Sequence, residues 1–293
     1  MSKKAFVLGA SGFQGSAIAR KMISNGYVVS TLSSDPAKPT LPAAVEVIEG
    51  GLNAPSLIEE ALKGVAVAIY TFPVLFDLEK ALSYTQNFIA AAKNQRVPLV
   101  IYNSSADVPD SPTGLLGQDL KIEIQDMLEK SGLSVLTLMP DIYLDNLAAP
   151  WSIPLVLEKK ILPYPIKSGA KIPWISHEDL ARFVAAAPEK PSLAGQKLPI
   201  GGTLLSGEEI AAAISQHLGE TIHFVSLQPD DFEGQLRPAF GEVTAREIAN
   251  LYRYLEQNRE KLIQKPFATV NELLGVQPQS IAEWVQSVRW SVA

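Results

Sequence analysis

A glycine-rich turn near the amino end has the residue spacing that could bind a phosphate group. It follows an apolar, strand-like segment over 4–8 and opens a helix-like segment over 12–24. Its first glycine permits a tight turn, the second lets the backbone approach a diphosphate, and the third allows helix and strand to pack closely. Since a helix N-terminus favours an anion, the spacing predicts a dinucleotide-binding strand–turn–helix, with an ordinary tight turn as the alternative. The residues expected to bind the cofactor here are Gly9, Ser11, Gly12, Phe13, Gln14 and Gly15.

The end of the next strand-like segment, 27–32, bears on which dinucleotide binds. An acidic side chain there would accept a hydrogen bond from a ribose 2′-hydroxyl, whereas small hydroxyl groups tolerate a 2′-phosphate. Ser33 and Ser34 leave room for a phosphate and can hydrogen-bond it, and Lys38 is near. Asp35 lies late, beside a proline, and is interpreted as a turn residue. The sequence therefore favours NADP(H), with NAD(H) as the alternative.

Further candidate ligands follow other strand-like segments, at the sheet edge where ligands of open α/β sheets gather. For the serines the alternative is a hydroxyl bonded to nearby backbone, and for the aromatic residues it is core packing. Asn53 is also a good helix cap before Pro55. Candidate cofactor-binding residues are Asn53, Thr71, Phe72, Pro73 and Ser104, and tentative substrate contacts are Ser105, Tyr143, Asn146 and Trp174.

The elements that would position these residues alternate between strand and helix through the first half of the chain. Short apolar segments bounded by Gly, Pro, Asn or Asp are typical of buried parallel strands. We predict an α/β fold with a doubly wound parallel Rossmann sheet. The expected strands are Lys4–Leu8, Tyr27–Leu32, Val45–Ile48, Ala66–Thr71, Leu99–Asn103 and Ser134–Leu138. The expected helices span 12–24, 55–63, 77–94 and 118–130.

The second half of the chain has a different texture. Prolines and tryptophans crowd residues 149–175, which predicts irregular structure and short edge strands, as in a lid or cleft wall. Capping boxes are expected at Ser176 with Asp179 and at Ser206 with Glu209, and the remaining tail is largely helical. We therefore expect a smaller, mostly helical C-terminal substrate lobe. The predicted domains are 1–150 with 176–202 packed on it, and a lobe formed by 151–175 and 203–293.

Composition excludes several classes of function. The net charge is −6 without a basic patch, so nucleic-acid binding is disfavoured. The chain has no cysteine, which removes disulfides, thiol catalysis and cysteine–zinc sites, and the histidines show no metal-ligand spacing. Apolar runs are too short to cross a bilayer or to form a secretory signal. We expect a cytoplasmic protein with a small-molecule substrate and no metal; neither charge nor heptads indicate an oligomeric state.

Several motifs in order resemble the NmrA-like family of atypical short-chain dehydrogenases/reductases. That group includes NADPH-dependent quinone reductases, isoflavone-reductase-type enzymes and catalytically silent redox sensors. The resemblance implies a Rossmann fold and a nicotinamide cofactor. The motifs are the glycine-rich turn, Tyr102 to Ala106, Pro140 to Asn146, Pro173 to Asp179, and the closing Leu273-Leu274-Gly275 with Ala282-Glu283-Trp284.

The resemblance also bears on catalysis. Many relatives carry Tyr-x-x-x-Lys, in which the phenol acts as acid and the lysine holds the nicotinamide ribose. Lys121 stands at the lysine position, but Gly117 replaces the tyrosine, as in isoflavone-reductase-type relatives, which lack it too. The alternative for Lys121 is a boundary lysine whose stem covers apolar surface. Two functions follow: an NADP(H)-dependent reductase of a quinone or similar conjugated carbonyl, or a silent dinucleotide sensor acting through a protein partner.

Overall fold

The structure is a computed structural model that describes residues 3–38 and 40–291, and the chain divides into two compact units. The first unit ends its opening segment at Pro140, ten residues before the expected boundary at 150, and it also contains Glu272–Val276. The first comprises Met1–Pro140, His177–Ile200 and Glu272–Val276, and the second comprises Asp141–Ser176, Gly201–Asn271 and Gln277–Ala293.

The first unit is built on a parallel sheet whose strands, in the described residues, run in the order β10-β6-β5-β4-β1-β2-β3. The strand order reverses direction between β1 and β4, and this is where doubly wound sheets bind ligands. The predicted fold class and the six predicted strands are confirmed. The strands are β1 (Lys4–Val7), β2 (Val28–Ser33), β3 (Glu46–Glu49), β4 (Val67–Thr71), β5 (Val100–Asn103), β6 (Val135–Pro140) and β10 (Lys197–Ile200).

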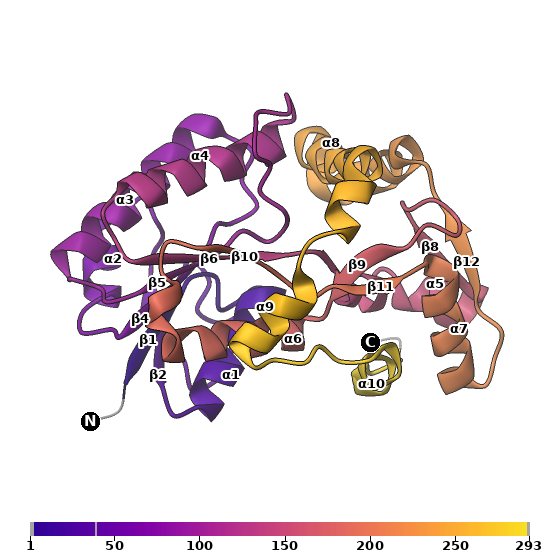
Figure 1. Cartoon of the computed structure of the whole chain (residues 1–293), viewed down its shortest axis with the longest axis horizontal. Coiled ribbons are helices and arrows are strands. Elements are labelled where there is room, and N and C mark those ends of the chain that lie inside the picture. Colours follow the sequence, from indigo (N-terminus) through magenta and orange to yellow (C-terminus); the bar gives the residue numbers. More distant parts are fainter. Residues whose placement is uncertain (1–2, 39, 292–293) are drawn as a thin grey trace. The chain divides into compact units, whose positions relative to one another are not determined.

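Helices cover both faces of this sheet (Figure 1). On one face α1 packs beside α6, and on the other α2, α3 and α4 lie side by side. An aromatic stack, with the Tyr70 and Phe88 ring centroids 4.3 Å apart, fills the core under the second group. The helices are α1 (Phe13–Ser24), α2 (Pro55–Ala61), α3 (Leu78–Asn94), α4 (Leu116–Lys130) and α6 (His177–Ala186), with short η2 (Ala187–Glu189) and η3 (Pro191–Leu193).

The second unit combines short strands with helices around its own aromatic core. Strand β9 pairs with β7 in parallel and with β11 antiparallel, and β8 pairs with β12 in parallel. Its strands are β7 (Ile142–Tyr143), β8 (Ile161–Tyr164), β9 (Ile172–Ile175), β11 (Thr203–Leu205) and β12 (His223–Ser226). Its helices are η1 (Leu144–Ala148), α5 (Ile153–Lys159), α7 (Gly207–Leu218), α8 (Pro229–Ile263) and α10 (Ile281–Ser287), while α9 (Phe267–Leu274) runs across the boundary at 271.

Two local expectations for this half of the chain have clear outcomes. The capping box at Ser206 is confirmed, because its hydroxyl accepts from the Glu209 N–H at 3.3 Å and the Glu209 carboxylate accepts from the Ser206 N–H at 2.8 Å. The prediction that 149–175 is irregular with edge strands is wrong in part, since α5 forms there. Pro154 lies in the first turn of that helix, where a missing N–H costs no hydrogen bond.

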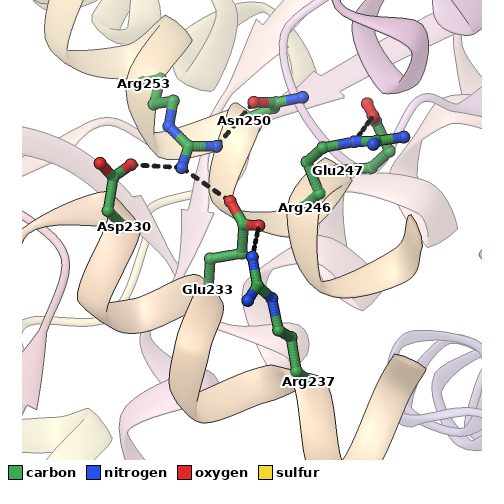
Figure 2. Close-up of polar contacts among 7 residues, drawn as sticks. All are labelled: Asp230, Glu233, Arg237, Arg246, Glu247, Asn250 and Arg253. Carbon is green, nitrogen blue, oxygen red and sulfur yellow. Dashed lines mark hydrogen bonds and ion pairs between the residues drawn. The ribbon is translucent and has the colours of Figure 1, made fainter. Parts of the chain in front are cut away.

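Helix α8 is broken at Gly241, whose backbone (φ 76°, ψ 168°) is not helical. We call 229–240 the proximal segment and 242–263 the distal segment. Figure 2 shows the Arg253 guanidinium of the distal segment donating to Asp230 at 2.5 Å and to Glu233 at 2.7 Å, both in the proximal segment. Glu233 also accepts from Arg237 at 2.8 Å. The two Arg253 ion pairs join the segments across the break, and the Arg237 pair lies within the proximal segment. We call these three ion pairs the α8 clasp.

Candidate functional site

The glycine-rich turn has a geometry that only glycine supports. Gly9 adopts a positive φ of 75°, and its carbonyl accepts a hydrogen bond of 2.8 Å from the Gly12 N–H. A Cβ at position 15 would lie 2.1 Å from that same carbonyl oxygen. Such an approach to backbone leaves no room for a side chain, so Gly15 lets α1 start directly against the end of β1.

The start of α1 is suited to an anion. Gly12 is its N-cap, no described side chain caps it, and its first turn contains no acidic residue. The N–H groups of that turn and the helix dipole therefore present partial positive charge, and the turn itself contributes no carboxylate to neutralise it. Phe13, which follows the cap, is 55% exposed.

At the end of β2 the two candidate serines differ. The Ser33 hydroxyl donates to the Asp35 carbonyl at 2.9 Å and accepts from the Asp35 N–H at 3.1 Å, so it closes the turn. The Asp35 carboxylate accepts from the Ala37 N–H at 3.2 Å, as expected of a turn residue. Ser34 is exposed, which makes its hydroxyl the one better placed to bind a ligand.

The following loop is tied to the glycine-rich turn. The Thr40 hydroxyl donates to the Ser11 carbonyl at 2.5 Å. This bond brings the segment after β2 onto the turn that opens α1. Ser11 itself is half-buried, and its carbonyl is engaged by this bond.

Polar side chains from three segments meet at the carboxyl edge of the sheet. Asn103 at the end of β5 donates to Gln14 at 2.8 Å and to Thr71 at 3.2 Å, and the Ser105 hydroxyl also donates to Gln14 at 3.1 Å. We call these four side chains the amide network. Three of its members were predicted site residues, and Asn103 was not. A single signal could have found it, because it is an amide at the end of an otherwise apolar strand.

Ser104 turns away from this network. Its buried hydroxyl lies 2.5 Å from the Ala106 carbonyl and 3.2 Å from the Leu138 carbonyl. This is the backbone-bonding arrangement given above as the alternative for the serines.

Lys121 bends back along α4. Its ammonium donates to the Gly117 carbonyl at 2.8 Å and to the Gln118 side-chain oxygen at 2.6 Å. Asp119 fixes the loop before this helix by accepting from the Thr113 N–H at 2.7 Å and its hydroxyl at 2.8 Å. The backbone carbonyl of Gly117 thus faces the lysine one helical turn away.

The remaining candidate cofactor-binding residues of the first unit are Asn53, Phe72 and Pro73. The N-cap of α2 is Ala54, and no described side chain caps that helix, so the reading of Asn53 as its cap is wrong. Asn53 is exposed; Pro55 nonetheless opens the helix as expected. Phe72 is half-buried and Pro73 exposed directly after β4, at the same sheet edge as Thr71.

Three of the four tentative substrate residues lie in the second unit, and one of them, Trp174, belongs to its core. Trp174 is 1% exposed, and its indole N–H donates to the Leu205 carbonyl at 3.1 Å. Tyr143 is buried in β7, and Asn146 donates to the Tyr164 hydroxyl at 3.2 Å. The Tyr164 hydroxyl in turn lies 2.6 Å from that of Tyr252. These residues lie in a different unit from Ser105, the fourth tentative substrate contact.

Two broader features bear on the kind of site. Within 3–38 and 40–291, no cluster of three or more His, Asp or Glu side chains is arranged to hold a metal ion. No helix of the described chain combines the length and apolarity needed to span a membrane.

A doubly wound parallel sheet, with a glycine-rich turn after its first strand and an uncapped helix N-terminus there, defines a Rossmann-type α/β protein. The family model of the NmrA-like family matches residues 1–285. The chain belongs to this family, and the predicted resemblance is confirmed.

Proteins similar to this chain include both enzymes and a regulator. The NAD(P)H azoreductase of Xenophilus azovorans is 28% identical over 228 residues, 75% of this chain and 76% of that protein. The Citrobacter sp. triphenylmethane reductase complexed with NADP(H) has a TM-score of 0.79 at 16% identity, covering 98% of this chain and 100% of that one. The Escherichia coli NADPH-dependent quinone oxidoreductase complexed with NADPH has a TM-score of 0.72 at 21% identity, covering 97% of this chain and 98% of that one. NmrA, a negative transcriptional regulator, has a TM-score of 0.73 at 17% identity, covering 98% of this chain and 96% of that one.

Proposed function

We propose that this chain binds NADP(H) at its glycine-rich turn and transfers hydride to a quinone or a similar conjugated carbonyl compound. The observation that carries the proposal is the approach of Gly15 to Gly9, which opens α1 directly at the edge of the sheet, behind a glycine N-cap. That arrangement favours a diphosphate. The redox part is supported by the relatives, three of which are named as reductases or oxidoreductases with NAD(P)H, NADP(H) or NADPH.

The proposed binding roles follow from position. The N–H groups at the start of α1 bind the diphosphate, and the exposed Ser34 hydroxyl binds the 2′-phosphate of NADP(H). NAD(H), which lacks that phosphate, is the alternative dinucleotide. The nicotinamide supplies the hydride when bound. Lys121 holds the nicotinamide ribose and stabilises negative charge that develops on the acceptor oxygen.

A quinone acceptor suits the replacement of tyrosine by Gly117. Hydride addition to a quinone gives a hydroquinone anion and leaves the oxidised dinucleotide. That anion is comparatively stable, so a proton from water completes the reaction without a side-chain acid. A less stabilised alkoxide from a simple ketone would need the missing phenol.

The test is direct. Binding of NADPH and NADH is measured by fluorescence titration, and NADPH oxidation is then followed with a panel of quinones, azo compounds and simple ketones. We expect NADPH to bind more tightly than NADH and quinones to be reduced faster than ketones. If neither NADPH nor NADH binds, the proposal is overturned.

Lys121→Ala tests the proposed catalytic role. We expect kcat to fall about a hundredfold, because a charge that stabilises the developing oxyanion is lost. Lys130→Ala is the matched control on the same helix: its ammonium is exposed and pairs with Asp126, and its loss should leave kcat unchanged. Equal kinetics of the two variants would return Lys121 to the role of a boundary lysine.

A second candidate function is a dinucleotide sensor that catalyses nothing and acts through a protein partner. Gly117 favours it, because the usual proton donor is absent, and one similar structure is that of a regulator. Tight NADPH binding without oxidation by any acceptor in the panel would support the sensor and exclude the reductase.

A further inference from the structure

Asn103 occupies the centre of the amide network. It ends β5, and its side chain is fully buried, with 0% of the residue exposed. Its Nδ2 donates to Gln14 at 2.8 Å and to Thr71 at 3.2 Å, while its Oδ1 accepts from the Ser105 N–H at 3.1 Å. One buried amide therefore bonds the first turn of α1, the end of β4 and the loop after β5.

The orientation of both amides follows from one backbone group. A backbone N–H can only donate, so the Ser105 N–H requires Oδ1 of Asn103 on its side. The Nδ2 group then faces Gln14, which must present Oε1 to it. The Ser105 hydroxyl donates to the same oxygen at 3.1 Å, so Gln14 is held by two donors.

The network also supports a costly backbone conformation. Ser105 adopts a φ of 60°, in the left-handed region that residues other than glycine rarely populate. The bond from its N–H to Asn103 spans two residues, as in an Asx turn, and stabilises this conformation. The loop after β5 thus depends on Asn103 for its shape.

The network lies on one side of the strand-order reversal. In a doubly wound sheet the diphosphate lies over the first turn, the adenosine ribose lies toward the end of β2, and the other half of the dinucleotide extends across the reversal. In the order β5-β4-β1-β2, Thr71 and Asn103 stand on the side away from β2. Gln14 belongs to the diphosphate turn itself.

We propose that Asn103 is a positioning residue that couples the diphosphate-binding turn to the nicotinamide side of the site. It acts through Gln14, Thr71 and Ser105 and does not touch the ligand. This inference rests on the proposed binding of NADP(H) and is independent of hydride transfer. Because Asn103 holds Gln14 at the diphosphate turn and Thr71 and Ser105 beyond it, its loss weakens ligands that reach the nicotinamide side more than ligands that end at the turn.

The experiment compares two ligands on Asn103→Ala by isothermal titration calorimetry. NADP+ spans both halves, whereas 2′,5′-ADP carries the adenosine half and no nicotinamide. We expect the NADP+ Kd to rise about tenfold, as for the loss of a buried hydrogen-bond partner, and the 2′,5′-ADP Kd to rise by about threefold or less, because its 5′-phosphate still meets the turn that contains Gln14. Asn87→Ala is the matched control, since that half-buried amide donates to the Leu52 carbonyl at 2.9 Å in the same unit. It should leave both Kd values within twofold of wild type.

If Asn103→Ala does not fold, Thr71→Val is the second variant, because it removes one acceptor of the network with little change in volume. We expect it to raise the NADP+ Kd more than the 2′,5′-ADP Kd, by a smaller factor than Asn103→Ala. Equal weakening of both ligands, or no weakening of NADP+, would overturn the coupling role while leaving the proposed function intact. A wild-type chain that binds neither ligand would overturn the proposed function, and the coupling role with it.

Discussion

At the scale of single residues, two glutamines on α4 make a natural comparison. Gln118 and Gln125 are both buried, at 2% and 4% exposure. Gln125 is satisfied on both sides, because its oxygen accepts from Thr137 at 2.8 Å and its nitrogen donates to Glu129 at 2.9 Å. The Gln118 oxygen accepts from Lys121, but its nitrogen has no hydrogen-bond partner among the described residues. An unpaired buried donor costs about 1–3 kcal/mol, so the useful part of Gln118 is its bond to Lys121.

This contrast predicts opposite effects on stability. Gln118→Leu should leave the free energy of unfolding unchanged or raise it, because it removes the unpaired donor, and should lower kcat because Lys121 loses an acceptor. Gln125→Leu should destabilise by about 1–3 kcal/mol, because Thr137 and Glu129 lose their partner. Urea unfolding and NADPH oxidation measure both quantities. A loss of stability in Gln118→Leu as large as in Gln125→Leu would contradict this account.

The site residues show where sequence reasoning works at this scale. The roles expected of Gly9 and Gly15 could be derived because each glycine answers a backbone constraint visible in the spacing. The buried place of Trp174 and the network around Asn103 could not, since both depend on contacts between segments far apart in the chain. Asn103 and Gln14, for example, are 89 residues apart.

At the scale of elements, Gly15→Ala tests the strand–turn–helix. Its methyl group would lie 2.1 Å from the Gly9 oxygen and 2.9 Å from the Ala10 nitrogen, both backbone atoms, so the turn must shift. We expect a loss of about 1–3 kcal/mol, as for overpacking, and at least tenfold weaker NADPH binding. Gly234→Ala in α8 is the control: its Cβ would meet nothing within 4 Å, and alanine should stabilise that helix by about 0.5–1 kcal/mol. Thermal unfolding and nucleotide titration compare the two.

In the sheet of the first unit, the strands that the sequence predicts and the one it misses differ in a physical way. The six predicted strands are runs of apolar residues, because all but the edge strand β3 have a neighbour on each side. Strand β10 contains Pro199 and precedes two glycines, which locally resembles a loop. It pairs with β6 alone, at the edge of the described sheet, where a proline need not donate to the ladder.

The α8 clasp predicts that the second unit loses stability in acid. Hydrogen bonds from Arg253, followed by those from Arg237, lower the pKa of Glu233, and Asp230 also faces the Arg253 guanidinium (Figure 2). A lowered folded-state pKa contributes stability that is present above the usual carboxyl range and is lost as the pH falls through the folded-state value.

We therefore expect amides of the proximal segment to lose protection, relative to their intrinsic exchange rates at each pH, as the pH falls below the usual carboxyl range and before the first unit unfolds. Glu233→Gln should show fast exchange there already at neutral pH and little further change in acid. Hydrogen exchange followed by mass spectrometry from neutral pH to about pH 3, corrected for intrinsic rates, makes this measurement. Glu256→Gln, an exposed carboxylate on the distal segment, serves as the control and should behave as wild type. Exchange in Glu233→Gln that depends on pH as in wild type would exclude the clasp as the cause.

At the scale of the whole molecule, the chain passes repeatedly between the two units. Their boundaries fall at 140, 176, 200, 271 and 276. The passage into the second unit after Pro140 has a local signal, because prolines become frequent there. The return to the first unit over 177–200 also has one, because a helix is followed by a strand-like segment. The return of Glu272–Val276 to the first unit has none, because it depends on what those residues contact and not on what they are.

This division gives a test that separates the two candidate functions. NADPH at about a hundred times its Kd should stabilise the folded protein by about 2.7 kcal/mol. For a reductase that binds at the glycine-rich turn, we expect the strongest protection from hydrogen exchange at 9–16 and 103–106, and less in the distal segment of α8. A sensor must instead pass the binding signal to a surface that a partner reads, so protection or deprotection far from the turn should be as large as at the turn. Gly15→Ala at the same NADPH concentration shows which changes depend on binding. Strong protection of the distal segment that persists in this variant would contradict both readings, because it would not come from a ligand at the turn.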